Sequence, residues 1–246
     1  MAGRLSLLGA GKQAVAPAVW TPLSISGCDT WLDFSDATTM FTDAGTTVVT
    51  TDNDLVYQVN DKSGNGHNLV QAESDNRPYY KTSYLNGNDA IFFDALDWMS
   101  FSSVTAQTPV TVFIASYRPY NVYGRVTLAS ASYHGRMYGA TAFKTSGSNE
   151  TTNNMGTTNS VNMIIVGTHA SDGGEFKVYN KKTIRIDGTG NGYYGAFSYL
   201  GRLTSAVNET TSGTPIHIYE ILVYNSVLSQ SDRETVTDYL STKWAI

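Results

Sequence analysis

The residues that decide the fold lie near the C-terminus, where the chain reads Ile216-His217-Ile218-Tyr219-Glu220-Ile221-Leu222-Val223-Tyr224. This run of β-branched and aromatic residues predicts a long strand. Ser229 follows as a candidate helix N-cap, and Asp232 lies three positions later, as a capping box requires. The apolar residues after it are spaced as on one face of a helix of about four turns, over residues of about 230–243; they are Val236, Tyr239, Leu240 and Trp244. The chain is therefore predicted to end in a strand that leads directly into one amphipathic helix.

Further strands and motifs are distributed along the rest of the chain. Continuous apolar character predicts central strands at Val110–Tyr117 and Val161–His169, and another strand is predicted at Met137–Phe143. In the first hundred residues, the motifs are Trp31-Leu32-Asp33-Phe34-Ser35-Asp36, Val59-Asn60-Asp61-Lys62-Ser63-Gly64-Asn65-Gly66-His67, Arg77-Pro78-Tyr79-Tyr80, Leu85-Asn86-Gly87 and Ile91-Phe92-Phe93-Asp94.

In order and spacing, these motifs and the C-terminal strand and helix resemble the laminin-G-like, concanavalin A-like jelly-roll domains of phage virion proteins and bacterial surface proteins. The resemblance covers residues 26–246 as one domain. It implies an all-β fold, a two-sheet antiparallel jelly-roll sandwich with an extended N-terminal arm and one C-terminal helix. Such a fold hosts lectins, glycosidases and structural modules alike, so it does not decide the function.

Composition restricts the kind of protein and its partners. The chain has 246 residues, of which 15% are charged, and a net charge of -5. This length predicts one large β domain, and the acidic balance argues against a nucleic-acid partner, which would require a basic face. Cys28 is the single cysteine, so an intrachain disulfide is excluded. A stretch of about 18 apolar residues is missing, so membrane insertion is not expected.

Residues 1–25 precede the predicted domain, and we call them the N-terminal arm. They contain mainly Gly, Ala, Val, Leu and Pro, and such a segment cannot bury enough apolar surface to fold alone. The arm would either pack along its own domain or dock on another subunit or another protein. We favour docking, because burial of apolar side chains on a partner would offset the loss of chain entropy; the side chains expected to be buried there are Leu5, Leu7, Leu8, Val15, Val19 and Trp20.

Enzymatic activity is not expected from the sequence. Glycosidases use two carboxylates at a matched separation, and the nearest approach to such a pair is Glu73-x-Asp75, in a turn-like stretch. The Gly-x-Ser-x-Gly motif of a nucleophilic serine is missing. The four histidines also lack a spacing typical of zinc ligands.

One segment has the beginning of a calcium loop. Asp61, Ser63 and Asn65 place oxygen-bearing side chains at alternate positions before Gly66, but Ala72 stands at the twelfth loop position, where such loops have a bidentate glutamate. The interpretation we favour is a turn in which Asp61 and Asn65 satisfy backbone amides and Gly66 has a positive φ. We therefore expect no metal and no other cofactor.

Tyrosine-rich segments make glycan binding the most reasonable ligand hypothesis. Residues 117–125, 133–138 and 191–194 combine aromatic rings, which stack on sugars, with Asn, Arg and His side chains, which bind hydroxyl groups. The alternative is that these tyrosines cap the core or line a subunit contact. The candidate glycan-binding residues are Tyr120, Tyr123, Tyr133, His134, Tyr193 and Tyr194.

The N-terminus lacks a convincing signal peptide, because Leu5-Ser6-Leu7-Leu8-Gly9-Ala10-Gly11 is too short and too rich in glycine for its apolar region. Virion proteins reconcile this absence with a fold that mostly works outside cells, since they assemble in the host cytoplasm. The resemblance thus implies a non-enzymatic bacteriophage virion protein, a capsid decoration or a tail or fibre accessory protein. Its expected partners, through the N-terminal arm, are other virion proteins or copies of itself. The alternative is a carbohydrate-binding module for a host surface glycan, and a virion protein can also have this activity.

Overall fold

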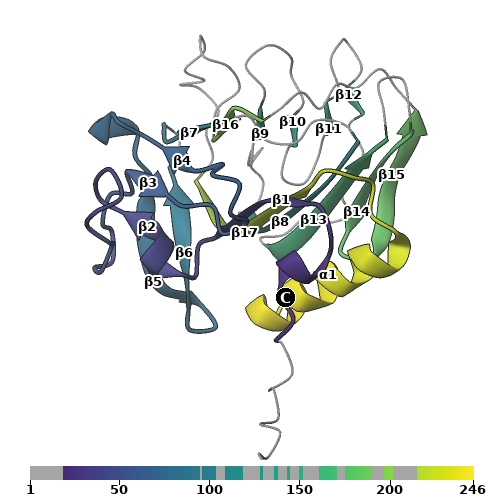
Figure 1. Cartoon of the computed structure of the whole chain (residues 1–246), viewed down its shortest axis with the longest axis horizontal. Coiled ribbons are helices and arrows are strands. Elements are labelled where there is room, and N and C mark those ends of the chain that lie inside the picture. The colour runs from purple at the N-terminus through teal and green to yellow at the C-terminus, as the bar shows by residue number, and fades with distance from the viewer. Residues whose placement is uncertain are drawn as a thin grey trace, which may run out of the picture.

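The computed structural model shows an all-β sandwich with one C-terminal helix (Figure 1), which confirms the predicted fold class. None of the helices in the described part of the chain is long and apolar enough to cross a membrane. The structure describes residues 19–94, 96–103, 109–118, 128–129, 136–137, 143–144, 150–151, 161–170, 175–189, 197–201 and 215–246.

The strands form three antiparallel sheets. The large sheet has eight strands: β1 (Cys28–Asp33), β5 (Tyr79–Leu85), β6 (Asn88–Phe93), β8 (Val110–Arg118), β13 (Val161–His169), β14 (Glu175–Asn180), β15 (Thr183–Thr189) and β17 (Ile216–Tyr224). The small sheet has six short strands: β2 (Met40–Phe41), β3 (Gln58–Val59), β4 (Leu69–Val70), β7 (Met99–Phe101), β9 (Leu128–Ala129) and β16 (Tyr199–Leu200). A third sheet has three strands: β10 (Arg136–Met137), β11 (Phe143–Lys144) and β12 (Glu150–Thr151).

The predicted C-terminal strand is β17, with the predicted bounds, and it lies at the centre of the large sheet. β17 pairs with β8 on one side, and on its other side with β6 and then with β1. The predicted central strands are also confirmed as β8 and β13. The single strand predicted at Met137–Phe143 is wrong, because Met137 of β10 and Phe143 of β11 pair with each other in antiparallel register.

Apolar side chains form a core on each face of the large sheet. The face toward the small sheet contributes alternate residues such as Val112, Ile114 and Val223 to the first core. The opposite face, which we call the outer face, contributes Phe113 and Leu222 to the second core. Burial on both faces explains why these strands have continuous apolar runs instead of a polar alternation.

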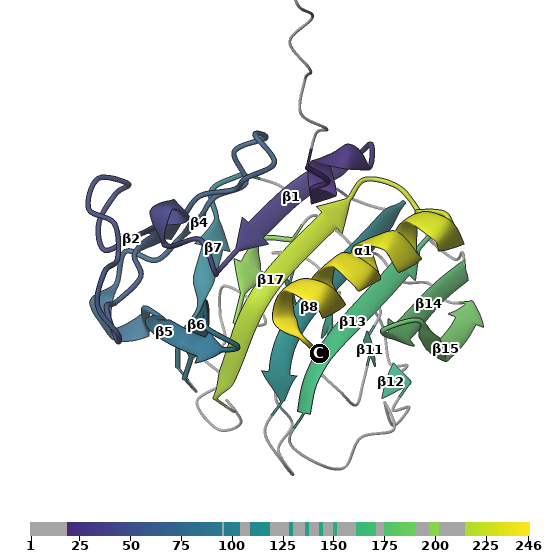
Figure 2. The same ribbon diagram turned by 90° about the horizontal axis from the view of Figure 1, so that it is seen from below.

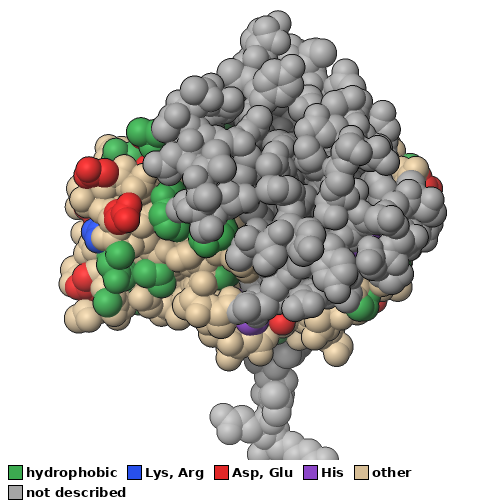
Figure 3. Space-filling view, turned by 90° about the horizontal axis from the view of Figure 1, so that it is seen from above, with side chains coloured by type: hydrophobic (Ala, Val, Ile, Leu, Met, Phe, Trp, Pro, Cys, Tyr) green, Lys and Arg blue, Asp and Glu red, His purple; other side chains and the backbone are tan. Residues whose placement is uncertain are grey.

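The helix α1 (Gln230–Trp244) packs on the outer face and closes the second core. It crosses β17, β8 and β13 (Figure 2). The predicted N-cap is confirmed, since the Ser229 hydroxyl accepts a hydrogen bond from the Asp232 amide at 3.1 Å. The predicted apolar face is also correct: Val236, Leu240 and Trp244 are buried against the sheet. Figure 3 shows the side of the molecule opposite α1. In the part of this side that the structure describes, apolar side chains lie among polar side chains and a few acidic ones.

Short 3₁₀ helices complete the described elements: η1 (Pro22–Ser24), η2 (Ala37–Thr39) and η3 (Ser74–Asn76). η1 lies against the end of β17, because the Tyr224 hydroxyl donates a hydrogen bond to the Pro22 carbonyl oxygen at 3.0 Å. The last part of the N-terminal arm is thus in contact with the sandwich.

Candidate functional site

A row of half-buried side chains crosses the outer face of the large sheet, beyond the C-terminal end of α1. The strand register places Tyr79 beside Phe92, Phe92 beside His217, His217 beside Tyr117, and Tyr117 beside Asn162. The five residues come from β5, β6, β17, β8 and β13 in that order, so the row follows the hydrogen-bonding direction of the sheet. We call these five residues the aromatic row. Sheet pairing places them side by side although they lie far apart in the sequence.

Tyr84 lies over the middle of the aromatic row. Its ring stacks on His217 with a centroid distance of 3.7 Å and an angle of 12° between the planes. The register of β5 against β6 shifts between Lys81 and Leu85, and Ser83 has a φ of 47°. At this irregularity, the hairpin of β5 and β6 bends toward β17. Tyr84 is 37% exposed, so its ring reaches solvent while it contacts His217.

His217 is the centre of this aromatic group. Its ring centroid lies 4.6 Å from that of Phe92 and 6.1 Å from that of Tyr117. Burial, and then the positive charge of Lys81, lower the pKa of His217 to about 4. The imidazole is therefore neutral at pH 7. The surface at neutral pH is an uncharged aromatic platform.

Polar groups lie at both ends of the platform. At the β13 end, the Asn162 side-chain oxygen accepts a hydrogen bond from the Tyr219 hydroxyl at 2.5 Å. At the β5 end, the Lys81 ammonium group donates to the side chain of Asn53. An amide and an ammonium group thus border the rings. Aromatic faces with a few fixed polar groups at the edge are typical of sites for small polar ligands.

The chemistry of this surface is suited to binding. The aromatic row and Tyr84 include no carboxylate, so these six side chains cannot supply the acid and nucleophile pair of a glycosidase. Among the residues that the structure describes, groups of three or more His, Cys, Asp or Glu side chains that could hold a metal ion do not occur. The expected lack of enzymatic activity remains a prediction.

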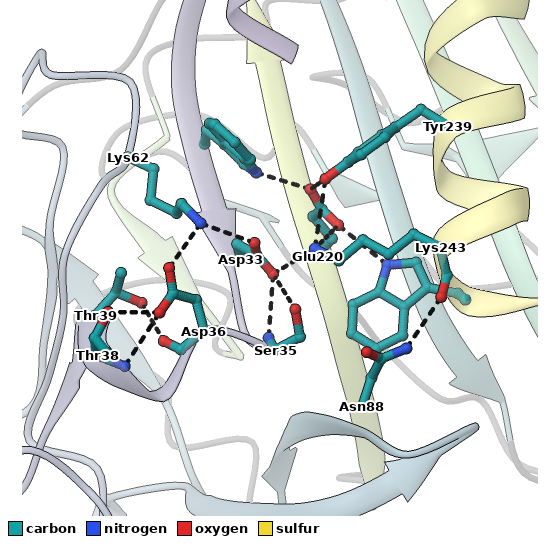
Figure 4. A network of polar contacts seen from close by, with 12 residues as sticks. Asp33, Ser35, Asp36, Thr38, Thr39, Lys62, Asn88, Glu220, Tyr239 and Lys243 are labelled. Atoms are coloured by element: carbon teal, nitrogen blue, oxygen red, sulfur yellow. Dashed lines mark hydrogen bonds and ion pairs between the residues drawn. The ribbon is translucent and has the colours of Figure 1, made fainter. Parts of the chain in front are cut away.

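A buried polar network holds α1 beside this surface (Figure 4). The Glu220 carboxylate accepts hydrogen bonds from the indoles of Trp31 at 2.7 Å and Trp244 at 3.1 Å, from the Tyr239 hydroxyl at 2.9 Å and from the Lys243 ammonium at 2.8 Å. Burial, and then the nearby Asp33 carboxylate, raise the pKa of Glu220. One side chain of β17 thereby connects β1 to the last two turns of α1.

A β-bulge in β17 makes this network possible. The register of β17 against β8 shifts between Ile218 and Glu220. Tyr219 stacks on the Trp244 ring at 5.0 Å, and Glu220 bonds to the indole of the same residue, so both consecutive side chains lie toward α1. Regular alternation would have directed one of them to the first core.

Asp33 of β1 extends the network toward the small sheet. Its carboxylate lies 2.6 Å from the Lys243 ammonium group and 3.0 Å from that of Lys62, which also contacts Asp36 at 2.8 Å. Burial alone would raise the pKa of Asp33, but the two ammonium groups and the hydroxyl of Ser35 outweigh it and lower this pKa. Asp33 is therefore ionised at neutral pH.

The candidate calcium residues form a turn. The Asp61 carboxylate accepts hydrogen bonds from the amides of Trp31, Ser63 and His67 and from the Ser63 hydroxyl. The Asn65 amide donates to the Asp29 carbonyl oxygen at 2.8 Å, and Gly66 has a φ of 78°. Asp61 and Gly66 thus behave as the favoured turn interpretation predicts. Asn65 differs, because its side chain donates to carbonyl oxygens, whereas we expected it to satisfy a backbone amide.

The other candidates from the sequence lie partly outside the described residues. All the glycan-binding candidates lie outside the described residues; they are Tyr120, Tyr123, Tyr133, His134, Tyr193 and Tyr194. Four residues of the N-terminal arm also lie outside them, namely Leu5, Leu7, Leu8 and Val15. Val19 is 86% exposed. Trp20, which we expected on a partner, packs instead on its own domain, with its ring 5.2 Å from that of Tyr239.

The members of the aromatic row were not among the residues that the sequence singled out as glycan-binding candidates. Tyr117 and His217 lie on the outer face of two central strands. From the sequence they were predicted only to belong to those strands. The one available signal is that Tyr117 and His217 are aromatic positions in two predicted strands, while Tyr79 and Phe92 are aromatic positions in two of the motifs. These residues can be recognised as one site only when the strand register is known, because a shift by one residue moves a side chain to the other face of the sheet.

Comparison with known proteins shows the fold. No protein-family model and no curated protein sequence matches the chain. Among solved structures, domain 4 of AbnA, a GH43 extracellular arabinanase from Geobacillus stearothermophilus in complex with arabinotriose, is similar with a TM-score of 0.58 and 12% identity, over 86% of this chain and 98% of that one.

Two further structures are similar over part of their length. The binding domain of Paraclostridial Mosquitocidal Protein 1 has a TM-score of 0.54 and 10% identity, over 84% of this chain and 53% of that one. A GH54 α-l-arabinofuranosidase soaked with a cyclic sulfate inhibitor has a TM-score of 0.50 and 16% identity, over 89% of this chain and 60% of that one. The chain therefore has a β-sandwich fold similar to that of the arabinanase domain and of the toxin binding domain.

Proposed function

We propose that this chain is a non-catalytic carbohydrate-binding module and that the aromatic row with Tyr84 is its saccharide site. The observation that carries the proposal is the set of aromatic side chains that the strand register aligns. The start of β17 and the end of β8, which carry two of them, lie beyond the C-terminal end of α1 (Figure 2). The rings would stack on the apolar C–H face of a sugar, and this contact requires no charge on the protein. The neutral state of His217 at pH 7 is compatible with such a contact.

The polar groups at the ends of the row would provide orientation. The Asn162 amide is held by the Tyr219 hydroxyl, so its position is set before a ligand binds. A fixed amide loses little freedom on binding and selects the orientation of sugar hydroxyls. The Lys81 ammonium group, held by Asn53, would do the same at the other end.

The structural comparisons support the choice of a saccharide as ligand. The arabinanase domain, which is similar to nearly all of this sandwich, was solved with arabinotriose. The similar toxin domain is described as a binding domain. Sequence identities of 10–12% establish only the fold, so the ligand class is inferred from the aromatic row.

A glycan array followed by calorimetric titration of the best binder tests the proposal. We expect Tyr84→Ala to lower the affinity about tenfold, because one exposed ring in the centre of a small site contributes roughly 1–2 kcal/mol. Tyr84→Phe keeps the ring and should retain most of the affinity. Leu96→Ala is the matched control, since Leu96 is an exposed apolar side chain, 51% exposed, outside the aromatic row.

The proposal is wrong if no glycan binds, or if Tyr84→Ala and Leu96→Ala have equal effects on affinity. Loss of binding in Tyr84→Ala counts as support only if its urea midpoint of unfolding matches that of Leu96→Ala. Binding that disappears when Tyr120, Tyr123, Tyr193 and Tyr194 are replaced, with Tyr84→Ala unchanged, would assign the site to the loops favoured from the sequence.

The virion role is a second candidate. The observation in its favour is Val19, an apolar residue that is 86% exposed where the described part of the chain begins. In this proposal the arm anchors the sandwich on another virion protein or on a copy of itself, in a particle assembled in the host cytoplasm. None of the three similar structures named above is described as a phage protein.

Deletion of residues 2–18 tests the virion role. This deletion keeps Trp20 on Tyr239 and Pro22 on Tyr224, so we expect a folded sandwich with an unchanged urea midpoint. Co-expression with the candidate particle proteins and quantitative mass spectrometry of purified particles would give the occupancy. A truncated chain that reaches full occupancy, or a full-length chain that joins no particle, would contradict the anchor role.

A further inference from the structure

A pocket lies on the outer face, beside the N-terminal half of α1 and away from the aromatic row. It has a volume of about 270 Å³ and lies between the N-terminal half of α1 and the strands β13, β14 and β15. Its apolar floor includes Val166, and its wall includes the ring of Tyr179. Since α1 has 15 residues, the helix spans about 22 Å. The pocket and the aromatic row are therefore separate sites.

The lining of this pocket is basic although the chain is acidic overall. Among the described lining residues of the pocket, four side chains are cations, namely Lys177, Lys181, Lys182 and Arg233, and one, Glu234, is a carboxylate. Lys182 pairs with Asp238 at 2.6 Å, and Lys177 lies opposite Asp187 in the β14–β15 register. Among the residues that the structure describes, neither Lys181 nor Arg233 forms an ion pair. Two positive charges thus face the pocket without a carboxylate bound to them.

The Arg233 side chain is held by its own contacts, and Lys181 is held through its backbone. The Arg233 guanidinium donates to the Leu228 carbonyl oxygen at 2.6 Å and lies over the Tyr179 ring, 5.0 Å from its centroid. Lys181 belongs to the turn between β14 and β15, and its backbone amide donates to Ile164 at 2.9 Å. The ion pair between Lys182 and Asp238 connects the same turn to α1. The pocket therefore presents the Arg233 charge before a ligand arrives, which lowers the cost of binding.

We infer that this pocket binds an acidic saccharide through its carboxylate. A guanidinium and an ammonium group form charge-assisted hydrogen bonds with a carboxylate, and the guanidinium can bind both of its oxygens. Glu234 and Gln230, which are hydrogen-bonded to each other at 2.8 Å, would contact sugar hydroxyls, since a carboxylate and an amide accept from them. Glu234 also disfavours ligands with several negative charges. The inference rests on the proposed function for the saccharide class but concerns a different site.

Calorimetric titration of the full chain with three probes tests the inference. The probes are a glucuronate disaccharide, its methyl ester and inorganic sulfate. We expect the disaccharide to bind, the ester to bind about tenfold more weakly because its charge is lost, and the affinity for the acid to fall as salt increases. Sulfate should bind more weakly than the disaccharide, because it lacks the hydroxyl contacts.

Two variants place the binding in the pocket. Lys181→Gln should lower the affinity for the acid about tenfold, while Lys181→Arg keeps the charge and should retain it. Ile184 lines the pocket and is 44% exposed, so Ile184→Glu adds a repelling charge without disturbing the core. This variant should abolish binding of the acid with an unchanged urea midpoint.

Equal affinity for the acid and its ester would overturn the inference, as would unchanged binding in both Lys181→Gln and Ile184→Glu. Binding of sulfate without binding of the disaccharide would overturn the saccharide assignment. Tyr84→Ala separates the two proposals, because it should leave the affinity for the acid unchanged while it weakens the neutral glycan. If the wild-type protein does not bind the acidic disaccharide, while Tyr84→Ala weakens binding of the neutral glycan, this inference alone is wrong.

Discussion

At the scale of single residues, Glu220 joins three parts of the molecule. Its carboxylate is completely buried and receives hydrogen bonds from Trp31, Tyr239, Lys243 and Trp244. A buried carboxylate is stable in a protein only when such donors replace the water that it loses. Glu220 therefore fixes the position of the C-terminal end of α1, which borders the aromatic row.

We expect Glu220→Ala to lower the free energy of unfolding by about 3–5 kcal/mol, because two buried indoles would lose their acceptor and Lys243 would keep only Asp33 of its two carboxylate partners. Urea unfolding followed by tryptophan fluorescence measures this change. Lys182→Ala is the control, since it removes an exposed ion pair between the β14–β15 turn and Asp238 of the same helix and should have a small effect. A Glu220→Ala protein that unfolds at the wild-type urea concentration would contradict the role of the network.

His217 makes stability depend on pH. Its pKa is lowered from the ordinary value of 6.5 to about 4 in the folded protein. Between these values the unfolded chain binds a proton that the folded protein excludes, so the free energy of unfolding decreases as the pH falls from 6.5 to about 4. His217→Phe removes this group and should reduce that decrease. Unfolding at pH 7 and pH 4.5 for both proteins gives the difference, and identical pH dependence would contradict the prediction.

At the scale of elements, the hairpin between β5 and β6 caps the end of α1. The Asn86 side chain donates to the Trp244 carbonyl oxygen at 2.6 Å, and the Asn88 side chain donates to that of Lys243 at 3.0 Å. These carbonyls have no partner within the helix, so the two amides satisfy groups that α1 leaves open. The same hairpin carries Tyr84, so one element both ends the helix and completes the aromatic surface.

The helix ends at Ala245 in a left-handed conformation, with a φ of 52°. Glycine is the usual residue there, because a Cβ atom is crowded by the backbone. We expect Ala245→Gly to raise the free energy of unfolding by about 1 kcal/mol, as measured by urea or thermal unfolding. Ala245→Val should lower it. A destabilised glycine variant would show that this conformation is not strained.

At the scale of the whole molecule, α1 is the cover of the second core. Without it, the side chains of Phe113, Ile164 and Leu222 would be exposed on the outer face. Truncation after Ser226 should therefore give an insoluble or aggregated protein, because an apolar patch of this kind drives association. Expression with solubility analysis and size-exclusion chromatography tests this expectation. A soluble monomer with the wild-type circular dichroism of its strands would contradict it.

Some of the secondary-structure elements predicted from the sequence agree with the structure, and the reason is local. β17, β13 and α1 were predicted at or within a residue or two of their observed bounds, because each depends on local signals: β-branched runs, apolar periodicity and the Ser229 cap. The Met137–Phe143 segment failed, because β10 and β11 pair with each other and a reversal of the chain is hard to distinguish from one strand by composition.

The sequence by itself determined the C-terminal strand and helix, since neighbouring residues carry the decisive interactions there. Its motifs also indicated the all-β class and the turn around Asp61. Only the tertiary structure decided that Tyr79, Phe92, His217, Tyr117 and Asn162 form one row, and that Lys181 and Arg233 share a pocket. The β-bulge that brings Glu220 to α1 was likewise decided only by the tertiary structure. The physical reason is that strand register and helix packing arise from contacts between distant segments, and these contacts leave no periodic pattern in the local sequence.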